Sequence, residues 1–411
     1  MTVNQSKVCR SCGTIGLKPI LSLGRTPLAN ALLTSDQLNE VEDTYPLDLA
    51  FCDQCCLVQI TETVSAETLF REYFYLSSFS DTMLRHAQNL AHQLIESRQL
   101  GPNSLVIEVA SNDGYLLRNY KREGIPVLGI EPATNIAQVA EQQHGIPTIC
   151  EFFGEQLAER LDSEGHRADV IHASNVLAHV ADLNGFVRGL SRILKDNGVV
   201  VIEVPYVKDM VDRCEFDTIY HEHLSYFSLT SLSRLFQKHG LVIHKVEQLT
   251  IHGGTLRVYL HHDGSDVQVN PTTELLMSES SWACDFGFYS DFGTRVEQLK
   301  LQLVDLLRGL KERNQRVAAY GASAKGSTLL NYCGIGRDML DYVVDRSTVK
   351  QGFYTPGTHL LIYPPEKLLE DEPEFVLLLT WNFVDEILQQ QSEYRRRGGR
   401  FIVPIPDVKL A

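Results

Sequence analysis

Apolar and polar positions in the middle of the chain follow the order of a parallel α/β sheet. An apolar run from Leu105 to Val109 precedes a polar turn, Ala110 to Gly114, and a helix is expected from about Tyr115. The next apolar run, VLGIEP, ends at Glu131. Strand, turn, helix and strand in this order predict a βαβ unit, whose loops at the carboxyl edge of the sheet are where such sheets bind ligands.

The same pattern continues further along the chain. A strand is predicted from Asp169 to Ala173, followed by a polar loop, a helix and the strand GVVVIEVP. Asn175 and His179 fall in the loop and first turn after the earlier strand, and their spacing places them on one helical face. A lone histidine is more often a surface or cap residue, but the position at the ligand edge makes both residues candidates for a site.

The C-terminal half repeats this organisation. A glycine turn leads into the strand of IHGGTLRVYLHH, and an amphipathic helix is predicted from about Asp291 to Gln315. RVAAYGASAKGSTLLNYCGI then predicts a strand, a glycine turn and a helix, and the next strand ends at Asp345. EFVLLLTWNFVDEILQQQ and GGRFIVPIP complete a second parallel α/β domain. Because Lys325 precedes Gly326, the turn does not match the P-loop, and ATP hydrolysis is disfavoured.

The length and net charge of the chain predict the number of domains and disfavour some classes of partner. A chain of 411 residues predicts two or three domains. No apolar run reaches the ~20 residues of a membrane span, and the N-terminal MTVNQSKVCRSCG lacks the apolar stretch of a signal peptide. We therefore expect a cytoplasmic protein with no membrane partner. The formal net charge of −15 makes nucleic acid an unfavourable partner.

Five of the nine cysteines lie in the first 56 residues. Cys9 with Cys12 and Cys52 with Cys55 form two C-x2-C pairs, the spacing that lets two thiolates reach one zinc ion. A redox C-x-x-C is the alternative, but the thioredoxin-like βαβ setting is missing. A site closed by four cysteines predicts a structural metal. Cys56 could replace Cys55, although the spacing favours Cys55.

The first glycine turn indicates the cofactor of the middle domain. EVASNDGYLL has one glycine, whereas a dinucleotide site usually shows G-x-G-x-x-G. An acid at position 131 suits the ribose hydroxyls of an adenosine, and the looser turn is typical of class I S-adenosylmethionine methyltransferases. An NAD site stays open as the alternative. The residues predicted to bind the methyl donor are Glu108, Ala110, Asn112, Asp113, Gly114, Tyr115, Leu116, Glu131, Pro132, Ser174 and Asn175.

The segment FDTIYHEHLSYFS places His221, Glu222 and His223 in succession between tyrosines. Consecutive side chains point in different directions, so a shared metal ion is disfavoured. A polar patch without chemistry is the second alternative. Acid–base chemistry is favoured, because histidine exchanges protons near neutral pH and tyrosine can hydrogen-bond a developing oxyanion.

These motifs together resemble the sugar C-3′-methyltransferases of the tetronitrose, mycarose and noviose pathways, which act on thymidine-diphospho-4-keto sugars. The resemblance covers nearly the whole chain. It is carried by the cysteine pairs and by LGRTPLAN, EYFYLSSFS, EVASNDGYLL, SNVLAHV, YHEHLSYFS and YGASAKGSTLLNYCG. It implies S-adenosylmethionine and structural zinc as cofactors. It also implies an α/β chain with a zinc-binding domain (1–70), a class I Rossmann-like methyltransferase domain (71–250) and a Rossmann-like nucleotide-sugar-binding domain (251–411).

The resemblance also implies a role for each matching residue. His223 would be the general base, Glu222 would support it, and Tyr220 would hold the C4 oxygen of the sugar. Asn175, His179 and Tyr75 would line the same site, with Tyr73 as an alternative to Tyr75. The residues expected to bind the nucleotide sugar are Ser323, Lys325, Gly326, Ser327, Lys350, Tyr354 and His359.

Three rival functions remain open on the residues alone. They are an NAD-dependent nucleotide-sugar oxidoreductase, methyl transfer to oxygen or nitrogen of a sugar, and a zinc-bearing scaffold without catalysis. The sequence leaves open the particular sugar and nucleotide, the stereochemistry at C3, the pathway of the product and the oligomeric state, with a monomer among the options.

Overall fold

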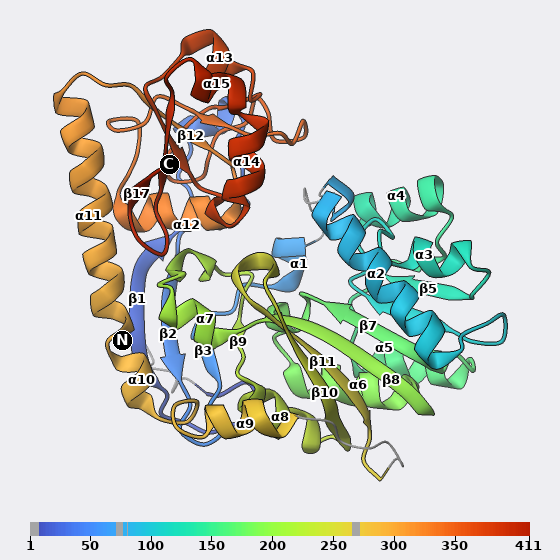
Figure 1. Cartoon of the computed structure of the whole chain (residues 1–411). Helices are drawn as coiled ribbons and strands as arrows, with labels where there is room; N and C mark the ends of the chain where they lie inside the picture. The colour runs from blue at the N-terminus through green and yellow to red at the C-terminus, as the bar shows by residue number, and fades with distance from the viewer. Residues whose placement is uncertain (1–7, 71–76, 80, 265–271) are drawn as a thin grey trace.

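The computed structural model describes residues 8–70, 77–79, 81–264 and 272–411. The described chain folds around three β-sheets of four, seven and six strands. Figure 1 shows the six-stranded sheet at the top, the seven-stranded sheet at the right and, below the first, the four-stranded sheet beside the long helix α11 (Phe292–Glu312). No described helix is both long and apolar enough to cross a membrane.

The four-stranded sheet is antiparallel and runs in the order β1-β2-β3-β9. The first three strands come from the N-terminal region, which ends in the short helix α1 (Ala66–Phe70). The fourth strand comes from the middle of the chain, where Tyr226 pairs with Val58. The N-terminal domain is therefore completed by the segment that contains the YHEH motif. The strands are β1 (Lys18–Thr26), β2 (Tyr45–Phe51), β3 (Val58–Ile60) and β9 (Ser225–Tyr226).

The seven-stranded sheet runs in the order β10-β11-β8-β7-β4-β5-β6 and confirms the predicted βαβ unit. Its strands from β6 to β8 are parallel, and β11 and β10 add an antiparallel edge. The strand β4 is buried at every position, as expected of a central strand covered on both faces. Its strands are β4 (Val106–Val109), β5 (Val127–Ile130), β6 (Thr148–Ile149), β7 (Ala168–Ser174), β8 (Leu194–Pro205), β10 (Leu241–Leu249) and β11 (Thr255–His262).

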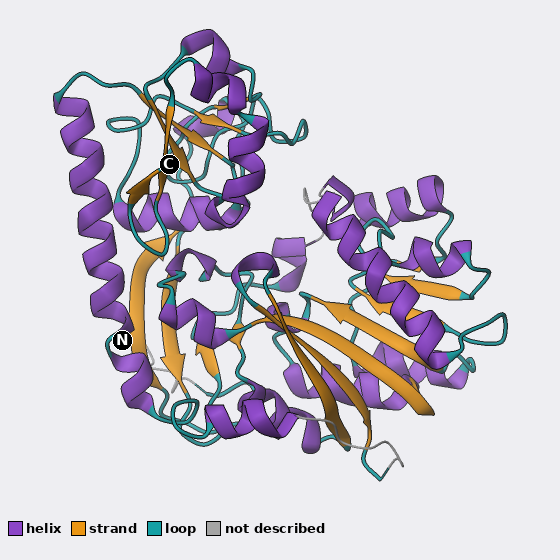
Figure 2. Cartoon of the chain, viewed as in Figure 1, coloured by secondary structure: helices purple, strands orange, loops and turns teal. Residues whose placement is uncertain are grey.

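Helices cover this sheet on both sides (Figure 2). The helix expected from about Tyr115 begins at Leu117, because the preceding residues belong to the turn. Strand β11 pairs with β8, so the sheet extends past the boundary expected at residue 250. The helices of this part of the chain are α2 (Asp81–Arg98), α3 (Leu117–Arg122), α4 (Thr134–His144), α5 (Glu155–Ser163), α6 (Leu183–Ile193), α7 (Val207–Asp212) and α8 (Leu229–Gln237).

The six-stranded sheet has the order β14-β13-β12-β15-β16-β17 and is parallel except for its last strand. This topology confirms the second parallel α/β domain. Its strands are β12 (Val317–Tyr320), β13 (Val343–Val344), β14 (Ile362–Tyr363), β15 (Phe375–Leu378), β16 (Arg400–Val403) and β17 (Lys409–Leu410). Its helices are α12 (Ala324–Cys333), α13 (Lys367–Asp371), α14 (Val384–Gln390) and α15 (Ser392–Arg396).

Among the described residues, three helices connect the two α/β domains: α9 (Thr272–Glu279), α10 (Phe286–Ser290) and α11 (Phe292–Glu312). The observed α11 agrees with the helix predicted from Asp291 to Gln315. It runs beside β1 and so lies along the N-terminal domain on its way to the C-terminal one (Figure 1). The carboxylate of Glu279 accepts the backbone N–H groups of Leu229 and Thr230 at 2.8 and 2.6 Å. A buried carboxylate at this position stabilises the N-terminus of α8.

Candidate active site and metal centre

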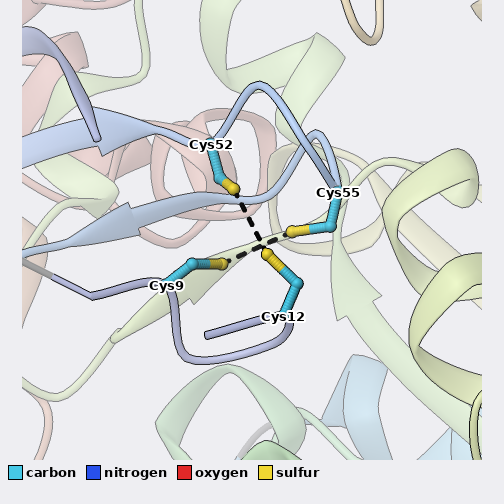
Figure 3. A group of neighbouring side chains, drawn as sticks. All are labelled: Cys9, Cys12, Cys52 and Cys55. Carbon is cyan, nitrogen blue, oxygen red and sulfur yellow. Dashed lines mark hydrogen bonds between the residues drawn. The ribbon is translucent and has the colours of Figure 1, made fainter. Parts of the chain in front are cut away.

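Two cysteine pairs from separate loops direct their sulfur atoms to one point (Figure 3). The Sγ atoms of Cys9 and Cys55 are 3.4 Å apart, and those of Cys12 and Cys52 are 3.5 Å apart. All four sulfur atoms lie within 4.8 Å of one another. Zn–S bonds of about 2.3 Å in a tetrahedron would separate the sulfur atoms by about 3.8 Å. The cluster therefore has the donor set and the size of a closed zinc site.

Burial of the cluster favours a bound cation. Cys9, Cys52 and Cys55 are buried, and Cys12 is exposed. Burial raises the pKa of the Cys52 thiol to about 11, so without a cation this group keeps its proton at neutral pH. Zinc binds the deprotonated sulfur, so its positive charge would stabilise the thiolate that burial disfavours. Four protein ligands leave no position for a substrate, so a zinc ion here would be structural.

Cys56 has a different partner. It forms a disulfide with Cys284, which lies between α9 and α10. The disulfide joins the zinc-binding loops to the segment that precedes α11. This pairing could not be predicted from the sequence, because 228 residues separate the two cysteines.

A cavity of about 840 Å³ lies between the two α/β domains and reaches the N-terminal domain. The N-terminal domain contributes Asn30 and Leu32 to its wall. The seven-stranded domain contributes the turn after β4 and the YHEH segment, and the C-terminal domain contributes the turn before α12. Residues from all three predicted domains therefore meet at one site.

The turn after β4 forms one end of the cavity. Ala110, Asn112 and Tyr115 line it, and the first two have left-handed backbone φ angles of 54° and 49°. Gly114 has a φ of 78°, and a Cβ at this position would lie 2.9 Å from Cγ1 of Ile146. The turn therefore requires glycine at this position, both for its backbone angle and for space.

Glu131 follows β5 and faces this turn. Its Oε2 accepts the backbone N–H of Asn112 at 3.0 Å, and its Oε1 accepts that of Ala133 at 2.9 Å. Burial raises the pKa of Glu131 to about 7. A carboxylate at this place in a Rossmann-like sheet is suited to accept the ribose hydroxyls of an adenosine cofactor.

The other predicted donor-binding residues fall into two groups. Pro132, Ser174 and Asn175 also line the cavity. Four residues do not line it: Glu108, Asp113, Gly114 and Leu116. Glu108 is buried, and burial raises its pKa. Asp113 accepts the backbone N–H of Ser78 at 3.3 Å through Oδ2. The hydrogen bond of Asp113 joins the turn to Ser78, and neither carboxylate lines the cavity.

The lining residues that the sequence analysis missed include Phe152, Phe153 and Gly154. These three follow β6, so they lie at the same carboxyl edge as the other loops. The available signal was the pair of adjacent phenylalanines, although the sequence analysis did not predict the short strand before them. The two phenylalanines add apolar surface to the cavity wall.

His223 and Tyr220 form a hydrogen-bonded pair in the cavity wall. Nδ1 of His223 lies 3.0 Å from the carbonyl oxygen of Thr218. A carbonyl can only accept, so Nδ1 carries the proton and Nε2 carries the lone pair. The Tyr220 hydroxyl lies 2.8 Å from Nε2 and donates to it. The imidazole is therefore held in the tautomer that a base needs.

His179 packs against this pair. The ring centroids of His179 and His223 are 4.7 Å apart. Burial lowers the pKa of His179 to about 4, so it is neutral at neutral pH. Asn175, with a left-handed φ of 55°, lines the cavity beside it. Tyr75, the remaining predicted residue, and its alternative Tyr73 lie outside the described residues.

The YHEH segment is held by the N-terminal domain. Asn30 Nδ2 donates to Oε1 of Glu222 at 2.6 Å. The His221 ring donates through Nε2 to the carbonyl of Pro46 at 3.2 Å. The next residues of the segment pair with β3 as strand β9. Asn30 belongs to the LGRTPLAN motif, and its contact with Glu222 could not be found from spacing.

The residues predicted to bind the nucleotide sugar are divided in the structure. Ser323, Lys325 and Lys350 line the cavity. Lys325 Nζ is buried and has no hydrogen-bond partner among the described residues. The predicted residues that do not line this cavity are Gly326 and Ser327, inside α12, and Tyr354 and His359, at the contact with the N-terminal domain.

Sequence profiles of known families match the chain in three consecutive parts. Residues 9–70 match a zinc binding domain, residues 83–246 a methyltransferase domain, and residues 250–406 a C-methyltransferase C-terminal domain. With the site described above, they define an S-adenosylmethionine-dependent methyltransferase that carries an additional zinc-binding domain.

Individual relatives make the class of methyltransferase more specific. The chain is 34% identical to C-methyltransferase NovU of Streptomyces niveus over 98% of its own length and 96% of that protein. It therefore belongs to the C-methyltransferase family of NovU and is an S-adenosylmethionine-dependent C-methyltransferase. A ubiquinone biosynthesis O-methyltransferase of Azorhizobium caulinodans is 26% identical over 30% of this chain and 47% of that protein.

Several solved structures each match less than half of the chain. Magnesium protoporphyrin IX methyltransferase from Synechocystis, with bound S-adenosylmethionine, has a TM-score of 0.34 and 12% identity. This similarity covers 44% of the present chain and 79% of the Synechocystis chain. The family assignment rests on the sequence matches.

We expect the purified protein to retain one zinc ion per chain through gel filtration. Cys52→Ser should lose most of this metal and lower the thermal midpoint, because it removes one of four thiolates. Metal analysis by mass spectrometry against protein concentration measures both proteins. Cys150→Ser, outside the cluster, is the control and should keep its zinc. A folded, active wild-type protein without zinc would contradict the assignment.

Proposed function

We propose that this protein transfers a methyl group to C3 of a nucleotide-linked 4-keto deoxysugar, through an enolate and with His223 as the general base. Thymidine diphosphate is the proposed nucleotide, from the resemblance of the motifs. The observation that supports the proposal best is the Tyr220–His223 pair in the wall of a cavity shared by both α/β domains.

The chemistry accounts for the residue types. Carbon has no lone pair, so methylation at carbon needs a carbanion equivalent. A ketone at C4 acidifies the hydrogen on C3, and a base that removes this proton leaves an enolate. C3 then bonds to the methyl carbon as the carbon–sulfur bond of the donor breaks. The protein must remove one proton, stabilise the charge on the C4 oxygen and hold the reactants in line.

The observed geometry is compatible with separate residues for proton removal and for stabilisation of the enolate. His223 presents an unprotonated Nε2, because Thr218 holds the proton on Nδ1. In the proposed complex Tyr220 turns its hydroxyl from Nε2 to the C4 oxygen, which frees the base and stabilises the enolate. Glu222 supports the imidazolium that forms, and its carboxylate is held by Asn30. Asn175, His179 and Tyr75 are proposed to line the sugar site.

S-adenosylmethionine supplies an electrophilic methyl group on a positively charged sulfur. We propose that its adenosine lies at the end of the cavity formed by the turn after β4, with the ribose hydroxyls on Glu131. Phe152 and Phe153 offer an apolar surface for a flat base. This placement leaves the methyl end of the donor to extend towards the YHEH segment.

The nucleotide diphosphate is proposed to bind at the C-terminal domain. Ser323 caps α12, and its side chain accepts the N–H of Gly326 at 3.1 Å. The N-terminus of a helix favours anions. Lys325 adds a buried ammonium group without a hydrogen-bond partner among the described residues. Lys350 Nζ lies nearby and donates to the carbonyl of Ala322 at 2.8 Å.

A methyl-transfer assay tests the proposed function. Protein, carbon-13-methyl-labelled S-adenosylmethionine and a panel of nucleotide 4-keto sugars are combined, each with a matched 4-hydroxy sugar. We expect a labelled methyl group on C3 of keto sugars only, seen by mass and by proton–carbon NMR. Label on oxygen or nitrogen, or transfer to the hydroxy sugars, would contradict the enolate reaction.

Replacing the base separates catalysis from binding. We expect His223→Asn to lower turnover by about 10²–10⁴-fold, the usual contribution of a general base. The affinity for S-adenosylhomocysteine, measured by calorimetry, should stay within about twofold. Tyr220→Phe, which removes one donor to the enolate oxygen, should lower turnover by about 10²–10³-fold. Turnover near the wild-type rate in folded His223→Asn would remove His223 from this role.

Asn30 allows the contribution of the N-terminal domain to be measured. Asn30→Ala removes a hydrogen bond to a carboxylate, worth about 1.5–3 kcal/mol, and leaves Glu222 without this partner. We expect turnover to fall by about tenfold or more. The control is Asn39→Ala, an exposed asparagine of the same domain. Equal turnover of the two variants would show that the Asn30 contact does not affect catalysis.

A further inference from the structure

The turn that leads to His223 is attached to the C-terminal domain by a buried hydrogen bond. Nε1 of Trp381 donates to Oδ2 of Asp217 at 2.7 Å. Asp217 is 0% exposed and lies in the 3-10 turn Phe216–Thr218, whereas Trp381 is 7% exposed and begins the turn Trp381–Phe383 after β15. The bond therefore connects the two α/β domains next to the cavity, which is lined by the neighbouring residues Thr218 and Thr380.

Asp217 directly precedes the residue that orients the imidazole. The carbonyl of Thr218 accepts the Nδ1 proton of His223 at 3.0 Å and also accepts the hydroxyl of Tyr226 at 3.3 Å. Because Asp217 and Thr218 are consecutive residues of one 3-10 turn, a shift of Asp217 is passed along the backbone to this carbonyl. The position and tautomer of His223 thus depend on where the 3-10 turn is held.

Trp381 also contacts the wall proposed to bind the nucleotide. Lys325 Nζ lies 4.8 Å from the centroid of the Trp381 ring. Burial raises the pKa of Asp217, and the Lys325 ammonium acts in the opposite direction. The indole is therefore placed between a cation in the cavity wall and the carboxylate that holds the turn of the base.

The C-terminal domain holds the other end of this turn as well. Thr328 of α12 donates through Oγ1 to the carbonyl of Ile219 at 3.1 Å. The turn is thus fixed on both sides of Thr218 by groups from α12 and from the loop after β15. A contact that served only to join the domains would not have to be placed at the residues that orient the imidazole.

We propose that Trp381 is a positioning residue: its hydrogen bond to Asp217 places the Thr218 carbonyl and thereby aligns His223. The C-terminal domain then both binds the nucleotide sugar and aligns the base that acts on it. This inference rests on the proposed function, in which His223 removes the C3 proton.

The chain offers a matched pair of variants, because it contains two tryptophans. Trp381→Phe removes the N–H and keeps most of the ring. Trp282→Phe is the control, since Trp282 is also buried, at 8% exposed, but its Nε1 has no hydrogen-bond partner among the described residues. The single-turnover rate of carbon methylation is measured for both with donor and 4-keto sugar saturating. Half-saturating sugar concentration, S-adenosylhomocysteine affinity and thermal midpoint are measured alongside.

We expect Trp381→Phe to lower the single-turnover rate by about tenfold to a hundredfold, the effect of a small misplacement of a catalytic group. Both affinities should stay within about twofold, and Trp282→Phe should keep the wild-type rate within about twofold. Asp217→Asn keeps an oxygen that can accept from Trp381, so it should be at least about tenfold faster than Asp217→Ala.

The experiment distinguishes failure of the proposed function from failure of the positioning role. A wild-type protein that forms no carbon-methylated sugar would overturn the proposed function and this inference with it. An active wild-type protein with equal rates in Trp381→Phe and Trp282→Phe would overturn the positioning role alone. A loss in Trp381→Phe that appears only in sugar affinity or thermal midpoint would also overturn it, because the contact would then serve binding or folding.

Discussion

The structure depends on one segment, residues 216–228, that all three domains share. Its first turn is bonded to the C-terminal domain through Asp217, and its last residues form strand β9 of the N-terminal sheet. Ser228 then caps α8 of the seven-stranded domain, where its side chain accepts the N–H of Ser231. Backbone pairing and buried hydrogen bonds therefore fix this segment from three sides. A site built on such a segment is preorganised without any side chain having to reach far from its own backbone.

Two buried carboxylates near the ligand edge of the seven-stranded sheet differ in their hydrogen-bond partners and therefore in their pKa. Glu203 is 1% exposed, and although burial acts to raise its pKa, His86 and Arg257 lower it to about 2. Glu131 is 6% exposed, but its described hydrogen bonds come from backbone N–H groups, and its pKa is about 7. The ion pair with Arg257 makes Glu203 part of the scaffold. The carboxylate of Glu131 has no such neutralising partner in those contacts and is the one suited to a ligand.

The sequence predicted what depends on local pattern. Alternating apolar runs located both α/β sheets, and paired cysteine spacing located the metal cluster, because these signals come from neighbouring residues. Contacts between distant segments were not predictable in this way. The bonds from Asn30 to Glu222 and from Trp381 to Asp217, like the Cys56–Cys284 disulfide, join residues more than a hundred positions apart. The periodicity of apolar residues carries no information about contacts between such distant residues. For the same reason the sequence did not predict that Tyr354 and His359 pack against the N-terminal domain.

The two α/β domains use the same device at their ligand edges. In the first, Glu131 after β5 accepts N–H groups from the turn after β4 and from Ala133, two residues beyond itself. In the second, Asp345 after β13 accepts the N–H of Ala322 at 2.7 Å, from the turn after β12, and that of Ser347, also two residues beyond itself, at 2.7 Å. In each case one carboxylate fixes the turn at the end of the preceding strand and so shapes one wall of the shared cavity. Because both turns open onto the same cavity, the two ligands of a group-transfer reaction can be held face to face by one repeated arrangement, with the shared segment 216–228 supplying the residues between them.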